Sequence, residues 1–591
     1  MSTSFLGVET SIMGQAWRWR GRSGPAGVAD DPGFQPDDLV TQLLMARGCP
    51  RDAVDDHRTP TIRGFMPDPS IFRDMDRAAE RLADAVIAGE AVAIFGDYDV
   101  DGATSAALMV RLLRALGLSP VVYIPDRILE GYGPTTAALT RLAADGASLI
   151  VTVDCGAQSF EPLAATHAAG IDVIVVDHHQ CAAELPAAFA VVNPNRVDEA
   201  EGAAFGHLAA VGVAFLLGSA LLRVLRRRGH FADRPEPRLI DMLDLVALGT
   251  VADVASLRGL NRAFVTQGLK VMGARRNVGI AALIEASRLT RNPTCSDLGF
   301  ALGPRINAGG RVGRADLGVR LLTTEDPEEA RILATELDRL NEDRRMIETA
   351  VNEAADAALQ QAGDRAVAVV GGRDWHPGVI GIVAGRLKEK LGKPVIVIAI
   401  DEKGMGKGSG RSIAGVDLGA AILAAKESGL LVAGGGHAMA AGLTIQADGI
   451  EALAAFLDER LRAAVDRSRG DRALLFDAVV AAGGVTPELV ESLDRGGPYG
   501  MGWPSPRIAA GPVRIIRADV VGNGHVRAIL SGADGRTIKS IAFRQADSPL
   551  GQALLAAGPD RRLWIAGRVR IDDWGSRPAA EMHIEDAAWA N

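Results

Sequence analysis

Residues 92–102 read VAIFGDYDVDG, an apolar run and a glycine followed by three aspartates at alternate positions, Asp97, Asp99 and Asp101. The apolar residues 91–95 predict a strand buried on both faces of a sheet. If the chain stays extended, alternate side chains leave the same face, so these carboxylates crowd one small patch. Such a patch at the end of a buried strand needs positive charge nearby.

Strand-like and helix-like segments alternate around this stretch. Helices are expected at 71–87, 103–116, 135–144 and 160–169, and further strands at 121–124, 148–153 and 172–176. This order predicts an α/β fold, with a parallel sheet covered by helices on both faces. In such sheets, ligands bind beyond the carboxyl ends of the strands.

Potential metal ligands follow three other predicted strands. They are Asp154 after 148–153, Asp177, His178 and His179 after 172–176, and Asp253 after an apolar segment at 245–251 that we also expect to be a strand. A parallel sheet brings all of these strand ends to one edge. Carboxylates and imidazoles without thiolates suit Mn²⁺ or Mg²⁺. Two such ions would neutralise the carboxylates, activate water and stabilise charge on a phosphate.

Each of these side chains also has a structural alternative. An aspartate after a strand is often a helix cap or a turn residue, and a histidine pair is often simply hydrogen-bonded. The alternating aspartates resemble a calcium loop, but the twelfth position of such a loop requires glutamate and here holds Leu108. The joint occurrence at successive strand ends favours the metal site.

Composition sets broad limits. The chain has 591 residues, a net charge of −9, a mean hydropathy of +0.12 and four widely spaced cysteines. This length suggests about three to five domains. The acidic balance disfavours a protein that coats nucleic acid through a basic surface. Without a signal peptide, an apolar run of ~20 residues or paired cysteines, we expect a cytoplasmic protein with no membrane partner.

The pattern of predicted helices and strands changes twice in the second half of the chain. Residues 326–362 predict one long, exposed connecting helix, and apolar segments at 366–370 and 394–400 begin a second α/β domain. From about residue 472, short strands separated by Gly and Asp turns predict a small β-barrel or sandwich. The strands expected there lie at 512–516, 537–543 and 562–571.

Together these motifs resemble a known family. FGDYDVDG, VDCG, VDHH and GTVAD stand in the order of the four motifs of the DHH phosphoesterases. From about residue 60 to the C-terminus the chain is also similar to RecJ, the single-strand-specific exonuclease family within this group. The motifs that carry this similarity are PDRILEGYG (125–133), GPRINAGGRVG (303–313), WHPGVIGIVAGRL (375–387), GSGRS (408–412) and GGGHAMAAG (434–442).

The resemblance implies a domain organisation. It comprises an N-terminal extension (1–60), a DHH domain (61–325), a connecting helix (326–365), a DHH-associated α/β domain (366–468) and an OB-type barrel (469–591). It also implies Asp99, Asp101, Asp154, His178 and Asp253 as metal ligands for two ions, Mn²⁺ or Mg²⁺, with Asp97 and His179 as adjacent auxiliary groups. Many relatives carry a histidine where this chain has Phe95.

Other motifs suit a channel for a strand. Arg127, Ser409 and Arg411 offer a guanidinium fork, a hydroxyl and glycine amides, and the resemblance assigns them to a 5′-phosphate. Tyr132 offers a stacking surface, or is a plain turn residue. The remaining candidates are Arg305 and Asn307, which can contact a phosphate, and Gly435, Gly436 and His437, which approach the strand or begin a helix.

An OB-type barrel is a common binder of single strands. Its candidate contacts are Arg527, Lys539, Arg544, Arg568, Arg570, Phe543 and Trp574, although these residues could equally form an ordinary mixed surface. The resemblance leads us to expect asparagine where this chain has Trp503.

The implied activity is a two-metal, 5′→3′ exonuclease that releases 5′-mononucleotides from single-stranded DNA in recombination and repair. The implied protein is a monomer, with a helicase and a single-strand-binding protein as further candidate partners. Two alternatives stay open. One is a phosphodiesterase or pyrophosphatase for oligonucleotides, cyclic dinucleotides or other small substrates, and the other is a relative that binds single strands without cutting them.

Overall fold

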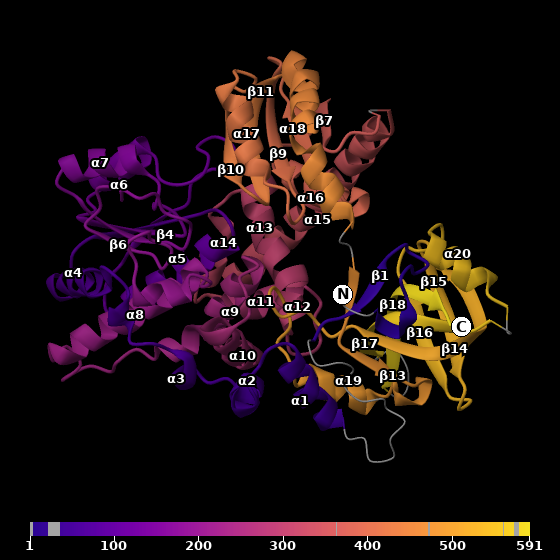
Figure 1. Ribbon diagram of the computed structural model, residues 1–591. Coiled ribbons are helices and arrows are strands. Elements are labelled where there is room, and N and C mark those ends of the chain that lie inside the picture. Colours follow the sequence, from indigo (N-terminus) through magenta and orange to yellow (C-terminus); the bar gives the residue numbers. More distant parts are fainter. Residues whose placement is uncertain are drawn as a thin grey trace. The chain divides into compact units, whose positions relative to one another are not determined.

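The computed structural model describes residues 4–21, 36–361, 363–470, 473–558, 561–572 and 578–590 (Figure 1). The chain forms two compact units. We call Phe65–Asp471 the central unit, and Met1–Gly64 together with Arg472–Asn591 the terminal unit. None of the described helices combines the length and the apolar character needed to cross a membrane.

The first sheet of the central unit has five parallel strands in the order β3-β2-β4-β5-β6. They are β2 (Val92–Gly96), β3 (Val121–Tyr123), β4 (Leu149–Val153), β5 (Asp172–Val176) and β6 (Ala190–Val192). All residues of β2 and β4 are buried, as their uninterrupted apolar runs predict.

Helices cover both faces of this sheet (Figure 1). On one face α6 (Thr136–Ala144) and α7 (Phe160–Ala168) pack apolar side chains against Phe95 and its neighbours. The helices α4 (Met75–Ala88), α5 (Val100–Ala115) and α8 (Ala210–Arg227) pack against β6, β2 and β4 on the other face. The expected α/β fold is confirmed.

The expected strand at 245–251 is wrong. These residues lie in helix α9 (Leu243–Ala252), which is buried along residues 243–250 and packs against α5 and α10 (Gly259–Gly273). A Cβ at Gly268 of α10 would lie 2.2 Å from the carbonyl oxygen of Leu243, so the two helices are in close contact. A short apolar run fits a buried helix as well as a buried strand, and periodicity does not separate them.

A helical segment follows α10. It contains α11 (Val278–Ala286), α12 (Cys295–Asp297), a single π-helical turn (Leu298–Leu302), α13 (Gly303–Val312) and α14 (Leu317–Thr323). The predicted long helix is α15 (Pro327–Gln361). It packs against α11, α13 and α14, and further along against α16 and β7, so it joins the two α/β domains.

The second sheet has the order β10-β11-β9-β8-β7, with β7 and β8 parallel and the other pairs antiparallel. Its strands are β7 (Ala368–Arg373), β8 (Val395–Ile400), β9 (Met405–Arg411), β10 (Ala433–His437) and β11 (Ala440–Gln446). Helix α16 (Ile380–Leu391) shares an apolar cluster with β7 and β8, and a separate cluster holds α17 (Leu418–Glu427) and α18 (Ile450–Gly470).

The glycine-rich GMGKGSGRS segment forms β9 in the middle of this sheet. A Cβ at Gly406, Gly408 or Gly410 would lie 2.6–2.7 Å from a side-chain carbon of Ile398, Leu443 or Leu418. The alternating glycines therefore let neighbouring side chains pack directly over the strand.

The terminal unit contains a β-barrel of order β13-β14-β15-β16-β18-β17, closed by pairing of β14 with β17. Its strands are β13 (Ala478–Val480), β14 (Ile508–Val521), β15 (His525–Gly532), β16 (Thr537–Ala542), β17 (Leu563–Asp572) and β18 (Ala579–Trp589). Further helices of this unit are α19 (Pro487–Asp494) and α20 (Pro549–Ala556).

Residues before 65 are part of this barrel unit rather than a separate extension. Strand β1 (Ala16–Trp19) pairs in parallel with β12 (Ala473–Phe476), and α1 (Pro36–Ala46) packs against α19. The buried Trp17 donates its indole N–H to Asp586 at 3.0 Å. The short helices α2 (Val54–Arg58) and α3 (Ile62–Phe65) follow.

Candidate metal centre

The three aspartates of GDYDVDG do not share one face. The chain turns into α5 after Asp99, whose carboxylate caps the helix by accepting hydrogen bonds from the amides of Asp101 (2.9 Å) and Gly102 (3.1 Å). Ligand atoms of Asp97 and Asp99 group with Asp154, all within 4.8 Å of one another. Asp101 lies in the first helical turn and belongs to a different group. The expectation of one extended patch is therefore wrong.

Asp101 is buried beside the N-terminus of α8. Its carboxylate accepts hydrogen bonds from the amides of Ala210 (2.6 Å) and Val211 (3.0 Å). These amides and the helix dipole favour a negative charge there. Burial and the nearby Asp99 nevertheless raise the pKa of Asp101 to about 7. A bound cation would remove this unfavourable balance.

His178 and Asp154 face each other with two acceptor atoms. His178 Nδ1 lies 3.1 Å from the carbonyl oxygen of Leu208, which assigns the imidazole proton to Nδ1. Burial, with the charge of His179, lowers the pKa of His178 to about 4, so the ring is neutral at pH 7. Its Nε2 lone pair then points at Asp154 Oδ1, 3.3 Å away. Burial and the surrounding carboxylates raise the pKa of Asp154, so without a metal ion the two atoms share a proton, and a divalent cation bound by both would take its place.

Asp177 positions the neighbouring histidine rather than joining a ligand group. Its carboxylate accepts hydrogen bonds from the amides of His178 (2.7 Å) and His179 (3.1 Å) and lies 2.7 Å from His179 Nδ1. Burial alone would raise the pKa of Asp177, but the bond and charge of His179 outweigh it and lower the pKa to about 2. The Tyr132 hydroxyl lies 3.1 Å from the same His179 nitrogen and donates to the Asp154 carbonyl at 3.0 Å.

Asp253 reaches the cluster from the C-terminal end of α9. It groups with Asp101 and His178, its carboxylate lying 3.9 Å from His178 Nδ1. Burial, with the charges of Asp101 and Asp99, raises the pKa of Asp253 to about 9. The candidate ligand named from the sequence therefore lies in the cluster, although the element that carries it is a helix.

The donor set fits hard divalent cations. Three groups of candidate ligands occur: Asp97, Asp99 and Asp154; Asp101, His178 and Asp253; and Asp154, His178 and His179. Buried Asp97 Oδ1, Asp154 Oδ1 and His178 Nε2 have no hydrogen-bond partner among the described residues. Such atoms are costly to bury unless a ligand satisfies them. Carboxylate oxygens with one or two imidazoles suit Mn²⁺ or Mg²⁺.

Phe95 adds no ligand to the cluster. Its side chain is fully buried in the apolar core and stacks on Tyr123, with 5.4 Å between the ring centroids. Asn193 and Asn195 were not expected from the sequence, and they hold the histidine loop by donating to the carbonyls of His179 (2.8 Å) and His178 (2.6 Å). Their position just after β6 is the only signal that the sequence offered.

A cleft of about 710 Å³ opens between the two α/β domains of the central unit. Arg127 and Tyr132 line it from the first domain, and Lys407 and Ser409 from the second. The Arg127 guanidinium lies over the ring of Tyr98, 4.8 Å from its centroid. Lys407, which the sequence analysis passed over within GMGKGSGRS, donates to the carbonyl of Ile128 at 3.4 Å.

Arg411 lies close to Ser409 on β9. Its guanidinium donates to Ser409 Oγ at 3.1 Å and to the Gly410 carbonyl at 2.8 Å. A Cβ at Gly381 of α16 would lie 3.0 Å from Ser409 Oγ, so this glycine leaves room for both side chains. Burial and the charge of Arg127 lower the pKa of Arg411, which places two guanidinium groups near each other.

Two arginines of α13, Arg305 and Arg311, make different contacts. Arg305 binds Asp338 of α15 (2.8 Å) and the carbonyl of Ala301 (2.8 Å), so it holds helices together, and Asn307 is partly buried on the same helix. Arg311 instead lies in the field of Arg127 and Asp99 and donates to the Gly378 carbonyl across the cleft at 3.0 Å. The phosphate contact expected of Arg305 stays a prediction, and Arg311 of the same motif is a further candidate for it.

The GGGHAMAAG motif forms a β-hairpin, so the helix start considered for it is wrong. Gly435 pairs with Gly442, Gly436 with Ala441 and His437 with Ala440. Residues 441, 443 and 445 are buried in alternation, which is the strand signal that the glycines obscured. His437 is exposed on β10 at the edge of the sheet, whereas Gly434 lines the cleft.

The candidate contacts on the barrel form a mixed surface with one aromatic group. Phe543 is 48% exposed and its ring meets His525 and His583 edge-on, at 5.2 and 5.0 Å between centroids. Acidic partners engage three of the cations: Arg527 with Asp519, Lys539 with Asp572 and Arg568 with Glu585. Arg544 adjoins Phe543, the charge of Arg570 acts on His583, and Trp574 lies outside the described residues.

Trp503 packs within the terminal unit. Its indole N–H donates to the Gly496 carbonyl at 3.1 Å, and the Arg47 guanidinium lies 5.1 Å from its ring centroid. The ring of His57 contacts it, with 4.4 Å between centroids. Trp503 therefore ties residues before 65 to the barrel unit.

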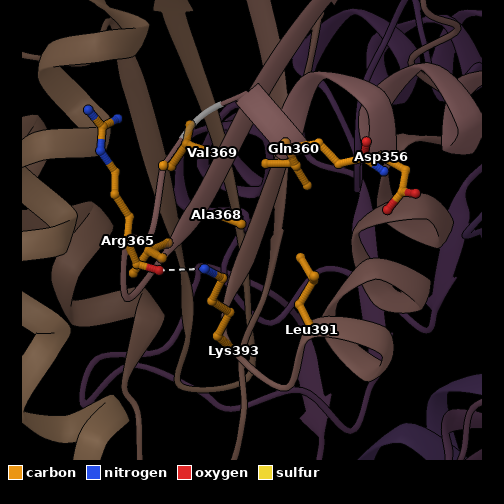
Figure 2. Close-up of a pocket in the computed structure, with 10 residues that line it drawn as sticks. Asp356, Gln360, Arg365, Ala368, Val369, Leu391 and Lys393 are labelled. Carbon is orange, nitrogen blue, oxygen red and sulfur yellow. Dashed lines mark hydrogen bonds between the residues drawn. The ribbon is translucent and has the colours of Figure 1, made fainter. Parts of the chain in front are cut away.

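A smaller cavity of about 140 Å³ lies at the end of α15 beside β7 and β8 (Figure 2). Leu391, Ala368 and Val369 line it, and Lys393 Nζ closes one side by donating to the Arg365 carbonyl at 2.6 Å. It contains none of the candidate functional residues. Asp356, Gln360 and Arg365 complete its mixed polar and apolar lining.

Three family models match separate segments of the chain. The model of the DHH family N-terminal domain matches residues 91–250, that of the DHHA1 domain residues 349–463 and that of the RecJ OB domain residues 476–586. The matched segments coincide with the first α/β domain, the second α/β domain and the barrel.

Individual proteins match over most of their length. The single-stranded-DNA-specific exonuclease RecJ of Dickeya dadantii is 40% identical over 538 residues, covering 89% of this chain and 92% of that protein. The Escherichia coli protein of the same name is 38% identical, covering 95% and 97%. The crystal structure of RecJ from Thermus thermophilus with Mn²⁺ has a TM-score of 0.74 at 31% identity, covering 93% of this chain and 76% of that one.

Proposed function

Because this chain belongs to the RecJ family of DHH phosphoesterases, we propose that it is a metal-dependent exonuclease that digests single-stranded DNA from the 5′ end. The products are 5′-mononucleotides. The observation that carries the proposal is the pair of facing acceptors, His178 Nε2 and Asp154 Oδ1, within a buried cluster of carboxylates. Divalent cations would satisfy that cluster, and relatives of this chain were crystallised with Mn²⁺ and with Mg²⁺.

Two of the ligand groups would each bind one ion. Asp97, Asp99 and Asp154 would hold one divalent cation, and Asp101, His178 and Asp253 the other. When bound, such ions lower the pKa of water and offset charge on a phosphate under attack. The α8 amides fix Asp101, and the Leu208 carbonyl fixes the His178 ring. Asp177 and Tyr132 hold His179 beside them, as an auxiliary group of the site.

The cleft explains the choice of one end of the strand. Arg127, Lys407, Ser409 and Arg411 present cationic and hydroxyl donors beside the acidic cluster, which suits a terminal 5′-phosphate next to a scissile phosphate. Arg311 lies between the two sets and would contact the backbone there. Anchoring the 5′-phosphate presents the first phosphodiester to the cluster. A cleft between two domains admits one strand and excludes a duplex.

The barrel adds a second contact surface. Phe543 with its flanking histidines offers a face for stacking a base, and Arg544 offers a charge for the backbone. We assign the enzyme to DNA recombination and repair, acting as a monomer with a helicase and a single-strand-binding protein as candidate partners.

A substrate panel tests the proposal. The protein is incubated with Mn²⁺ and end-labelled single-stranded DNA, duplex DNA or a cyclic dinucleotide. We expect mononucleotides from the single strand alone, beginning at its 5′ end. Cleavage of the cyclic dinucleotide alone would indicate a small-substrate phosphodiesterase, and strand binding without cleavage would indicate a silent relative. Either result contradicts the proposal.

A matched pair of variants tests the ligand assignment. Asp154→Asn removes a charge from an oxygen without a hydrogen-bond partner among the described residues, so folding is retained while cleavage is lost. Asp244→Asn makes the same change in a buried carboxylate of α9 outside the ligand groups and keeps cleavage. Mn²⁺ binding, measured by electron paramagnetic resonance, should weaken only in Asp154→Asn. Equal Mn²⁺ binding in both variants would refute the assignment.

A further inference from the structure

Two large apolar side chains of the central unit are strongly exposed. Leu129 and Phe300 are 85% and 80% exposed, the highest values for large apolar residues in the described part of the chain. Leu129 belongs to the segment that carries Arg127. Phe300 lies on the π-helical turn before α13, and the proposed function gives it no task. A fully exposed phenylalanine forgoes the stabilisation that its burial would provide.

The local backbone holds the Phe300 ring outward. Leu298 and Leu302 of the same π-helical turn are buried, so Phe300 occupies the opposite side. Arg305 secures the turn, because it binds the Ala301 carbonyl and Asp338 of α15. Single π-helical turns are rare and often occur at functional sites.

Phe300 lies near the metal ligand Asp253. The π-helical turn packs on the end of α9: a Cβ at Gly299 would lie 3.6 Å from a methyl group of Val251, and a Cβ at Gly303 would lie 3.3 Å from Ala252. Asp253 follows directly. Val254 next to it is 57% exposed and has a φ of 61°, which is strained for a β-branched residue. An apolar rim therefore borders this end of the cluster.

This rim lies away from the proposed pocket for the 5′-phosphate. Arg127 lies over the ring of Tyr98, the residue between Asp97 and Asp99 of one ligand group, whereas Asp253 belongs to the other ligand group. The cluster thus extends from Arg127 at one end to Asp253 at the other. A strand with its 5′-phosphate at Arg127 and its first phosphodiester over the cluster continues past Asp253.

We propose that Phe300 is a stacking platform for a nucleobase on the 3′ side of the scissile phosphate. The inference rests on the proposed function and adds to that function a contact that positions the strand. Aromatic stacking suits an enzyme that degrades any sequence, because every base offers a π face. Val254 would cover the edge of the same base.

An abasic scan tests this contact. A series of 5′-phosphorylated single strands carries one abasic residue, moved stepwise from the second nucleotide, and kcat/KM for release of the first nucleotide is measured with Mn²⁺. We expect one abasic position to lower kcat/KM of the wild type about tenfold, through KM. Phe300→Ala should lower kcat/KM on the intact strand by a similar factor. The abasic residue at that position should not lower the kcat/KM of Phe300→Ala further. Phe300→Tyr should restore the wild-type value.

Ile87→Ala, at an exposed apolar residue of α4, serves as the control and should behave as the wild type throughout. If every abasic position acts equally on the wild type and on Phe300→Ala, Phe300 contacts no base. The same holds if Phe300→Tyr is as slow as Phe300→Ala. Those results overturn this inference alone. A wild type that releases no nucleotide from any single strand overturns the proposed function instead.

Discussion

Asp244 in the first turn of α9 is a buried carboxylate that has no cationic partner at contact distance among the described residues. Its side chain accepts a hydrogen bond from the amide of Leu245 at 2.8 Å. Burial outweighs this bond and the more distant charge of Arg111, and raises the pKa of Asp244 to about 6. The native state therefore binds this proton more tightly than the unfolded chain, in which the pKa is about 4.

The sign of the pH dependence follows from this difference. Between about pH 4 and pH 6 the native state holds more protons than the unfolded state, so stability falls as the pH rises through this window. Above about pH 7 the buried Asp244 is ionised and the free energy of unfolding is lowered by the full amount. A pKa shift of about two units corresponds to about 3 kcal/mol. Asp244→Asn keeps the acceptor for the Leu245 amide and removes the titration.

The assay is urea unfolding of the full chain followed by circular dichroism, with chelator present, at pH 4.5 and pH 8. The free energy of unfolding of Asp244→Asn, relative to the wild type, should rise by about 2 kcal/mol between these two pH values. This comparison cancels any cost of the new amide group that is independent of pH. Asp145→Asn, on the exposed end of α6, is the control. An unchanged difference between the two pH values would refute the reasoning.

Three further changes test the packing and the cleft. Trp17→Ala should destabilise the terminal unit by about 3–5 kcal/mol, because it empties a buried site and removes the indole donor to Asp586 Oδ2; a Tm within error of the wild type would contradict this. Gly408→Ala places a methyl group 2.7 Å from Leu443 and should lower the free energy of unfolding in urea by about 1–3 kcal/mol. Gly385→Ala, which has open space around it, should not lower the free energy of unfolding. Arg311→Gln should lower kcat/KM on single-stranded DNA by about tenfold or more, because it removes a charge-assisted contact. Arg305→Gln should lower Tm and leave kcat unchanged. Equal effects of the two variants on kcat would contradict the different roles proposed for these arginines.

Local sequence patterns were sufficient for four of the five strands of the first sheet, whereas β6 was missed. Continuous apolar runs identified β2, β4 and β5, and helical periodicity identified the helices between them, because each signal lies within one element. Candidate ligands were also recognisable, since parallel strands share one carboxyl edge, and the structure brings Asp154, His178 and Asp253 into groups of possible ligands. The long helix α15 was recognisable for the same local reason.

Tertiary contacts decided the rest. The apolar run before Asp253 is a helix because α5 and α10 enclose it, an environment that its composition fits without specifying. Asp97 and Asp99 separate from Asp101 because Asp99 caps α5, and Arg305 is held by Asp338 of a different helix, α15. Likewise, β1 joins β12 across most of the length of the sequence. The sequence by itself determined which side chains are candidates for the chemistry, because residue types and local periodicity are written in it. Only the folded chain decided which of them meet, because that depends on partners hundreds of residues away.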